Sequence, residues 1–148
     1  MKAVVQIVDG ALVEVDNDTV GSIDAGMMIL LGVMEGDSEA EADVLIEKLV
    51  KMRTFKEGEK HFEVSVQDIE GGVLVVSQFT LGASFKKGRR PDFNMAEGPQ
   101  EAEKLYNYFV EKLRSEGVHV ETGKFGAYMQ VKLTNDGPIT YILDTSDL

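Results

Sequence analysis

The chain has 148 residues, 43 % of them hydrophobic and 28 % charged, which is the size and composition of one globular domain spanning residues 1–148. Because it contains no cysteine, disulfides, thiolate nucleophiles and cysteine-ligated zinc are excluded. Its net charge of −11 argues against non-specific binding to nucleic acid, whose phosphates carry charge of the same sign.

The first third of the sequence predicts a meander of short antiparallel strands. Apolar stretches favour the first two strands, and Asp9-Gly10 between them is typical of a hairpin turn. A continuous apolar run after Asp24-Ala25-Gly26 predicts a central strand that is buried on both faces. The predicted strands are Ala3–Val8, Ala11–Val15, Thr19–Ile23 and Met27–Val33.

A helix and then a hairpin are predicted next. Asp37 or Ser38 can cap the helix, because Ser38 and Glu41 have the spacing of a capping box. Apolar residues then recur at helical period, and the helix is expected to end before Phe55. After a polar loop, Lys56–Lys60, the hairpin is predicted as strands Val64–Ile69 and Val73–Phe79 around the turn Gly71-Gly72.

The second half combines a long loop, a helix and three strands. Leu81–Gly98 has no regular pattern, and loops of this length in a compact domain are usually functional or disordered. A helix is predicted from Pro99, a favoured first-turn residue, to a stop at Gly117. The predicted strands are Val118–Glu121, Ala127–Leu133 and Ile139–Leu143, with the last two joined by the turn Asn135–Pro138.

These elements predict the fold class. Two helices and eight or nine strands without a βαβ rhythm indicate an α+β fold, in which a mostly antiparallel, curved sheet or β-barrel carries two outer helices. An uncovered edge strand can pair with a second copy of the chain, which makes a homodimer plausible.

Two short segments are the candidates for an active site: Ser77-Gln78-Phe79-Thr80 and Asn135-Asp136-Gly137-Pro138-Ile139-Thr140. Each follows an apolar run, and the end of a strand can present backbone N–H groups and small polar side chains to a ligand. Ser77 and Thr80 are the best candidates for a hydroxyl nucleophile, but the sequence shows no nearby base that would activate either of them. In the structural alternative, the first segment is a plain strand end and the second is a hairpin turn.

Positive charge is concentrated in one place. Lys86, Lys87, Arg89 and Arg90 surround Gly88, and without these four residues the chain has 11 basic against 26 acidic residues. The cluster is either a solvated loop or a local contact for phosphate groups on an otherwise acidic protein.

No metal site, cofactor or membrane association is predicted. His61 and His119 lack a second ligand at metal-binding spacing, and neither a GxGxxG nor a GxxxxGK[ST] phosphate loop is found. The N-terminal residues do not resemble a leader peptide, and no run reaches the ~20 apolar residues of a membrane span. A cytoplasmic location is therefore expected.

Several motifs together resemble the D-aminoacyl-tRNA deacylases, a family first described as D-tyrosyl-tRNA deacylases. The match runs nearly from end to end, and two signatures occur in the order and at the separation that the family shows. The stretches that carry the resemblance are Met1–Gln6, Val75–Leu81, Lys87–Pro91, Leu105-Tyr106, Thr122–Val131 and Asn135–Thr140.

The resemblance implies a homodimer of β-barrel-like subunits. It implies hydrolysis of the ester between a D-amino acid and the terminal adenosine of tRNA, with mischarged glycyl-tRNA as a further substrate. Gly137-Pro138 would be a Gly-cisPro element that reaches into the partner's site, where its carbonyls reject L-amino acids. Gly137 allows close approach and Pro138 supplies rigidity.

The resemblance leaves two catalytic routes open. Backbone N–H groups near Phe79 and Thr80 would stabilise the tetrahedral oxyanion. Either the Thr80 hydroxyl is the nucleophile, or the 2′-hydroxyl of the tRNA assists attack by water, which we favour because no base for Thr80 is evident. The other implied roles are adenosine binding by Ser77 and Gln78, pocket lining by Phe125 and Met129, substrate binding by Asn135 and Thr140, and phosphate contact by Lys86, Lys87, Arg89 and Arg90.

The sequence departs from the family pattern at a few positions. Ile7 stands where the family usually has an arginine that is thought to fix the Gly-Pro element, and Tyr128 stands where aspartate is usual. His61-Phe62 replaces a common Met-Asn pair. Two other functions are therefore kept open: an inactive homologue that binds aminoacyl-tRNA or another adenosine-bearing ligand, and a structural dimeric β-domain.

Overall fold

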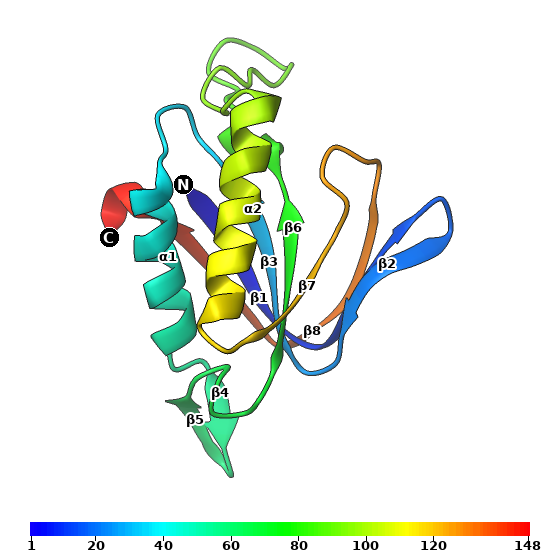
Figure 1. Cartoon of the computed structure of the whole chain (residues 1–148), viewed down its shortest axis with the longest axis vertical. Helices are drawn as coiled ribbons and strands as arrows, with labels where there is room; N and C mark the ends of the chain where they lie inside the picture. Colours follow the sequence, from blue (N-terminus) through cyan, green and yellow to red (C-terminus); the bar gives the residue numbers. More distant parts are fainter.

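A computed structural model describes residues 1–148, and Figure 1 shows the arrangement of its elements. Two α-helices pack beside a curved sheet, and a small separate hairpin lies at one end. The elements are β1 (Lys2–Val15), β2 (Asp18–Ile23), β3 (Gly26–Gly32), α1 (Glu39–Lys51), β4 (Phe55–Glu57), β5 (Lys60–Val64), β6 (Gly72–Ser77), the 3-10 helix η1 (Phe79–Gly82), α2 (Pro99–Ser115), β7 (His119–Thr122), β8 (Gln130–Asp144) and the 3-10 helix η2 (Thr145–Asp147).

Both predicted helices are confirmed, and their ends have the predicted chemistry. Ser38 caps α1 in a capping box, in which its side chain accepts from the Ala40 amide and the Glu41 carboxylate accepts from the Ser38 amide. Pro99 is the first residue of α2, where a missing amide hydrogen costs no intrahelical bond. No helix is both long and apolar enough to cross a membrane.

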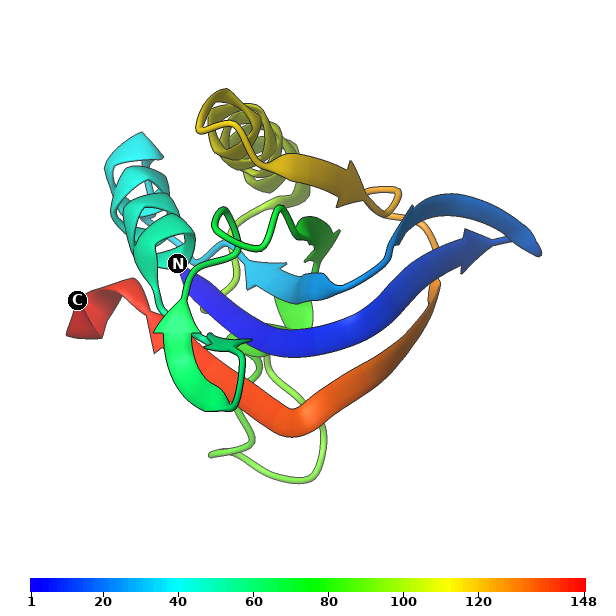
Figure 2. The same ribbon diagram turned by 90° about the horizontal axis from the view of Figure 1, so that it is seen from below.

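The first strand is one long curved element, so the predicted turn at Asp9-Gly10 is wrong. β1 pairs with β3 through Lys2–Val8 and with β2 through Ala11–Val15, while β8 pairs along its other edge. Figure 2 shows β1 (blue) and β8 (orange to red) as neighbouring curved strands. The turn residues instead lie where the register shifts between β1 and β8, and such irregularities bend a strand without reversing it.

The last strand is also continuous, so Asn135–Pro138 is not a hairpin turn. Both halves of β8 pair with the same strand β1, in one direction, which leaves no reversal of the chain. Thr140 is opposite Gln6 and Asn135 is opposite Val8, so residues 136–139 form a bulge opposite the single residue Ile7. Ile7 itself is 3 % exposed and belongs to the main core.

The sheet is mixed, which corrects the expectation that βαβ units are absent. β3 pairs with β6, and β6 with β7, in parallel, and the connections between them contain α1 and α2. The alternation of strands and helices is not evident in the sequence, because each connection contains more than a helix. The connection from β3 to β6 also contains the β4–β5 hairpin, and the connection from β6 to β7 also contains a long irregular loop. The predicted α+β class, a curved sheet or β-barrel with two outer helices, is confirmed, and the structure shows the sheet to be nearly closed.

The region before β6 differs most from the prediction. The polar loop Lys56–Lys60 is the tip of the β4–β5 hairpin, with Gly58 at a φ of +60°. Of the predicted strand Val64–Ile69, only Val64 is in a strand, as the last residue of β5. The residues after it form turns, because the Asp68 carboxylate accepts from the Ser65 amide at 2.8 Å and from its hydroxyl at 2.7 Å. These local bonds compete with a strand ladder.

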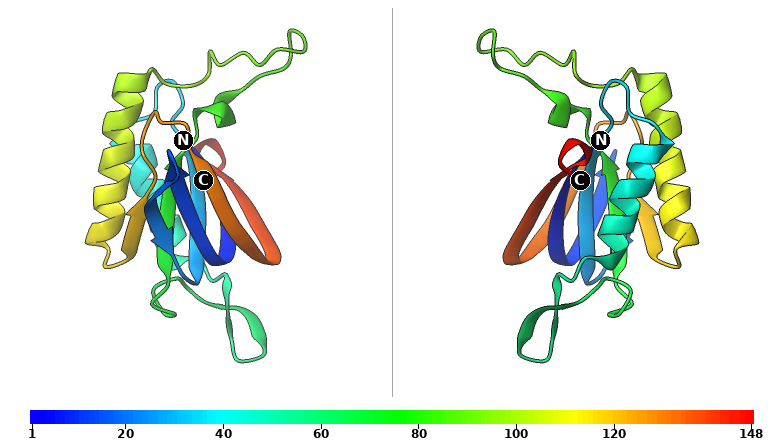
Figure 3. Two further views of the ribbon diagram at one scale, coloured as in Figure 1. Left: turned by 90° about the vertical axis from the view of Figure 1, so that its right-hand side faces the viewer. Right: turned by 90° about the vertical axis from the view of Figure 1, so that its left-hand side faces the viewer.

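The two faces of the sheet have separate apolar clusters. Met27, Ile29 and Leu31 point toward the helices and join the main core, while Met28 and Leu30 point to the opposite face. Figure 3 shows both helices on one side of the sheet. The helix-free face therefore carries a smaller cluster whose border is partly exposed at Leu30, Met129, Val131 and Leu133.

The sheet nearly closes where β2 approaches β7. A Cβ added at Gly21 would lie 2.2 Å from the carbonyl oxygen of Thr122, so only glycine permits this approach. β7 ends at Thr122, and the chain continues from there into residues 125–129, which line the candidate site.

Candidate active site

A pocket of about 610 Å³ opens at the edge of the sheet where β3 and β6 end. These strands run parallel, so their carboxyl ends lie together, as at many ligand sites of parallel sheets. The pocket is lined by the strand ends and by the loop before α2, the start of α2 and the segment that precedes β8; its residues include Val33, Val76–Phe79, Phe93, Ala96–Pro99, Ala102 and Phe125–Met129.

The chain leaves β6 through η1, which presents free backbone donors. The Gln78 amide still donates to Leu31 at 2.8 Å, and the Leu81 amide donates to the Gln78 carbonyl at 3.2 Å. Between them, the amides of Phe79 and Thr80 have no acceptor, because the first amides of a helix lack an intrahelical partner. Two adjacent free N–H groups, one of them on the pocket-lining residue Phe79, can bind an oxyanion.

The Thr80 hydroxyl is not prepared to act as a nucleophile. It accepts a hydrogen bond from the Gln78 side-chain amide, its one side-chain hydrogen bond, and no carboxylate or imidazole is bonded to it. An amide donor cannot take the hydroxyl proton, so it does not supply the general base that an alcohol nucleophile needs. Thr80 also lies outside the residues that line the pocket.

Aromatic contacts fix the walls of the pocket. The rings of Phe79 and Phe93 are 5.0 Å apart, and those of Phe125 and Tyr106 are 5.7 Å apart. The buried Tyr106 hydroxyl donates to the Val75 carbonyl at 2.8 Å, which joins α2 to the end of β6. Burial raises the pKa of Tyr106 to about 12, so its hydroxyl remains a donor at neutral pH.

The second candidate segment lies away from this pocket. None of residues 135–140 lines it, and Gly137 and Pro138 are exposed on the bulge of β8. Gly137 has a φ of +116°, and the peptide bond between Gly137 and Pro138 is cis. Within one chain, the pocket and the Gly-Pro element therefore do not meet.

Side-chain hydrogen bonds hold the bulge. The Asn135 side chain donates to the Thr140 hydroxyl at 2.9 Å and accepts from the Ile139 amide at 3.1 Å. Gln6 on β1 also donates to the Thr140 hydroxyl, at 3.4 Å.

The basic cluster lies on an arm, residues 84–92, that is rooted beside the pocket. Ser84 and Asp92 exchange two backbone hydrogen bonds of 2.7 and 2.8 Å that close the arm at its base. Figure 3 shows the loop of residues 83–98 (light green) reaching toward the side opposite the helices. Its cations Lys86, Lys87, Arg89 and Arg90 are exposed and form no ion pair within the chain.

The structure thus divides the predicted site residues into groups. It brings together Ser77, Gln78, Phe79, Phe125 and Met129 at the pocket. It leaves out the Thr80 side chain, the basic arm and the bulge residues Asn135, Gly137, Pro138 and Thr140. Four further lining residues, Phe93, Ala96, Glu97 and Ala102, belong to no sequence motif, although the length of the loop Leu81–Gly98 was a signal for the first three.

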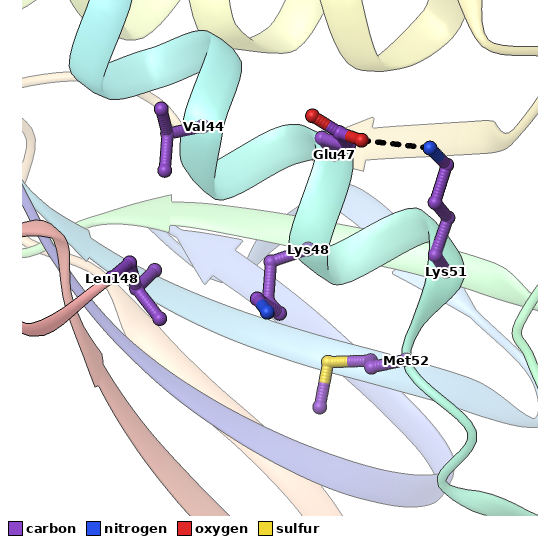
Figure 4. Close-up of a pocket in the computed structure, with 6 residues that line it drawn as sticks. All are labelled: Val44, Glu47, Lys48, Lys51, Met52 and Leu148. Carbon is purple, nitrogen blue, oxygen red and sulfur yellow. Dashed lines mark hydrogen bonds and ion pairs between the residues drawn. The ribbon is translucent and has the colours of Figure 1, made fainter.

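A second pocket, of about 470 Å³, does not compete for the function. It lies between α1 and the C-terminal segment, as Figure 4 shows, and none of the predicted site residues lines it. Its polar groups are lysines and a glutamate, and Lys51 and Glu47 are already paired at 2.8 Å. It offers no hydroxyl nucleophile and no free pair of backbone donors. Its lining residues are Val44, Glu47, Lys48, Lys51, Met52 and Leu148.

Comparison with known proteins identifies the relatives of this chain. Residues 4–144 match the family described as "D-Tyr-tRNA(Tyr) deacylase". The chain is 52 % identical over 147 residues to a D-aminoacyl-tRNA deacylase of Dehalococcoides mccartyi, with 99 % of this chain and 96 % of the relative covered. It is 48 % identical over 148 residues to one of Aquifex aeolicus, with both chains fully covered.

Solved structures show the same fold. The chain superposes on the c-Myc DNA Unwinding Element Binding Protein with a TM-score of 0.91 at 42 % identity, covering 97 % of this chain and 98 % of the other. A structure described as "a probable eukaryotic D-amino acid tRNA deacylase" has a TM-score of 0.80 at 20 % identity, covering 96 % and 97 %. This second similarity concerns the fold alone.

Proposed function

Because the chain belongs to the D-Tyr-tRNA(Tyr) deacylase family, we propose that it hydrolyses the ester that links a D-amino acid to the terminal adenosine of tRNA. Water adds to the ester carbonyl, the bond from that carbon to the ribose oxygen breaks, and the ribose oxygen takes up a proton. The products are a free D-amino acid and an uncharged tRNA. Mischarged glycyl-tRNA would be hydrolysed in the same way.

The observation that carries this proposal is the pair of free amides of Phe79 and Thr80 beside a pocket large enough for an aminoacyl-adenosine end. Ester hydrolysis passes through a tetrahedral oxyanion, and donors that are already in place stabilise it without reorganisation. The half-buried side chains of Ser77 and Gln78 line the same wall and would hold the adenosine. The 2′-hydroxyl of that adenosine would assist the attacking water, since the chain offers no base there.

Chiral selection would come from the bulge of a second copy. A D-substrate places its side chain where an L-substrate places hydrogen, so a rigid wall of backbone carbonyls can exclude one and admit the other. Gly137 and Pro138 are exposed and lie outside their own chain's pocket, which supports their insertion into a partner's pocket. Glycine has no side chain for the wall to exclude, so glycyl-tRNA would also be accepted.

The helix-free face of the sheet supports a homodimer. Its cluster of Val8, Val13, Met28 and Leu74 is bordered by partly exposed apolar residues, and two of these, Met129 and Val131, also line the pocket. A second copy that covers this face would bury the apolar border and bring its own bulge to the pocket.

The direct test is deacylation of D-Tyr-tRNA, L-Tyr-tRNA and glycyl-tRNA by the unmodified chain. We expect turnover of the D- and glycyl substrates and at least ~10²-fold slower turnover of the L-substrate, the range that a steric filter can supply. A folded protein that binds these tRNAs but hydrolyses none of them would instead indicate the binding module.

We expect the arm to contact tRNA phosphates. Replacing Lys86, Lys87, Arg89 and Arg90 by glutamine should weaken tRNA binding. It should also lower the slope of log Kd against log salt by about 3, since each of the four lost phosphate contacts is worth about 0.7–0.9 unit. The matched control replaces four exposed lysines of α1 and the β4–β5 hairpin by glutamine: Lys48, Lys51, Lys56 and Lys60. An equal change of slope in both variants would show that the arm has no special role.

A further inference from the structure

We infer that Asn135, Thr140 and Gln6 form a hydrogen-bonded clamp that positions Gly137-Pro138, and that this clamp sets how strictly L-substrates are rejected. The inference rests on the proposed function, because it concerns the element proposed to test chirality. It also changes the role assigned to Asn135 and Thr140. They are positioning residues that act through the bulge and do not bind the substrate themselves.

The contacts of Asn135 span the whole bulge. Its side-chain carbonyl accepts from the Ile139 amide at 3.1 Å, and its side-chain amide donates to the Thr140 hydroxyl at 2.9 Å. One side chain therefore bonds both residues that follow the Gly-Pro element. The bonds close a ring around residues 136–138, which removes freedom from a segment without ladder partners on β1.

The Thr140 hydroxyl joins this ring to the sheet. It accepts from Asn135 and, at 3.4 Å, from Gln6, which is its register partner on β1. With both acceptor positions taken, the oxygen has none left for a substrate amine. The hydroxyl therefore serves to attach the bulge to β1.

Gln6 is the one side chain of β1 that is hydrogen-bonded to the bulge segment, residues 135–140. The residue opposite it is Ile7, which is apolar, 3 % exposed and part of the main core. Ile139 packs against the same core and anchors one end of the bulge by apolar contact. Gly137 has no side chain, and Pro138 has no amide hydrogen to donate. The direction of the Gly-Pro carbonyls thus depends on the three polar side chains of the clamp.

The first measurement is independent of activity: hydrogen exchange of the Ile139 amide, followed by NMR. Thr140→Val keeps the shape of the side chain and removes the acceptor shared by Asn135 and Gln6. We expect the Ile139 amide to exchange about tenfold faster in this variant, the effect of losing about one hydrogen bond. Thr140→Ser keeps the hydroxyl and should preserve slow exchange. An unchanged rate in Thr140→Val would overturn the clamp.

The second measurement is the ratio of kcat/KM for D-Tyr-tRNA to that for L-Tyr-tRNA. We expect Thr140→Val to lower this ratio about tenfold by raising hydrolysis of the L-substrate, and Thr140→Ser to restore it. The matched control is Thr134→Val, because Thr134 is an exposed threonine of β8 whose side chain makes no hydrogen bond. A substrate-binding role predicts another result: KM rises for both substrates and the ratio stays constant, which would contradict the inference.

If Thr140→Val does not fold, Asn135→Ala tests the same clamp by removing the hydrogen-bond partner of Thr140. It removes both Asn135 contacts, so the same loss of discrimination is expected. If the unmodified chain hydrolyses neither D-Tyr-tRNA nor glycyl-tRNA, the proposed function fails, and the exchange rate of the Ile139 amide still decides whether the clamp exists.

Discussion

Hydrolysis of a D-aminoacyl-tRNA is expected to slow by about 10³-fold when the 2′-hydroxyl next to the ester is replaced by hydrogen, a typical loss for a general acid–base group. Thr80→Val, by contrast, should keep at least about one third of the activity, which corresponds to less than 1 kcal/mol. The reason is structural. The Thr80 hydroxyl accepts a hydrogen bond from the Gln78 side-chain amide and has no neighbouring base to take its proton. The backbone amides of Phe79 and Thr80, which would stabilise the oxyanion, remain free in the variant.

Binding must be measured alongside these rates. The 2′-deoxy substrate should bind with an unchanged Kd, because the arm and the pocket do not depend on that single hydroxyl. Thr80→Ser serves as the matched control for the valine variant. If Thr80→Val were folded, bound tRNA normally and had lost activity by 10³-fold or more while Thr80→Ser retained it, the hydroxyl would be the nucleophile.

Mixing two variants should restore chiral discrimination if the site is shared between subunits. Ala127→Trp is expected to abolish activity, since an indole at this pocket-lining position occupies the substrate's place. Gly137→Ala should stay active but lose discrimination by about 10²-fold, because alanine rarely adopts a φ of +116° and its Cβ would lie 2.6 Å from Ile139. Each variant thus damages a different half of the site.

In the mixture, an open pocket of the Gly137→Ala chain receives the intact bulge of the Ala127→Trp chain. With a tenfold excess of the inactive chain, the ratio of D- to L-hydrolysis should return close to the ratio of the unmodified protein. Mass spectrometry of the mixture checks that the chains have exchanged. If heterodimers form and the ratio does not change, the Gly-Pro element acts on the pocket of its own chain, and the prediction of a site shared between subunits is wrong.

Local signals predicted the elements that depend on neighbouring residues. The capping box of Ser38 and Glu41 and the first-turn Pro99 predicted both helices correctly. The Val73–Phe79 run predicted β6, although the strand ends at Ser77 because Phe79 already belongs to η1. In each case, the hydrogen bonds or the apolar periodicity that define the element lie within a few residues of one another.

Predictions failed where local turn signals competed with pairing to a distant strand. Asp9-Gly10 and Asn135–Pro138 both have the composition of hairpin turns, yet each lies within a continuous strand. The long antiparallel pairing of β1 with β8 keeps both chains extended through these positions, and the turn residues become bulges. The parallel pairs β3–β6 and β6–β7 were missed because their connections contain more than a helix.

The sequence by itself determined which chemical groups this protein has: no thiol, one basic arm, and two short segments that resemble a deacylase family. These depend only on which residues follow one another. The tertiary structure decided where the groups lie. It placed Ser77–Phe79 at a pocket, engaged the Thr80 hydroxyl with Gln78, and set Gly137-Pro138 on an exposed bulge outside that pocket. Strand pairing and burial join residues that are more than a hundred positions apart, and no local pattern specifies that partner or its register.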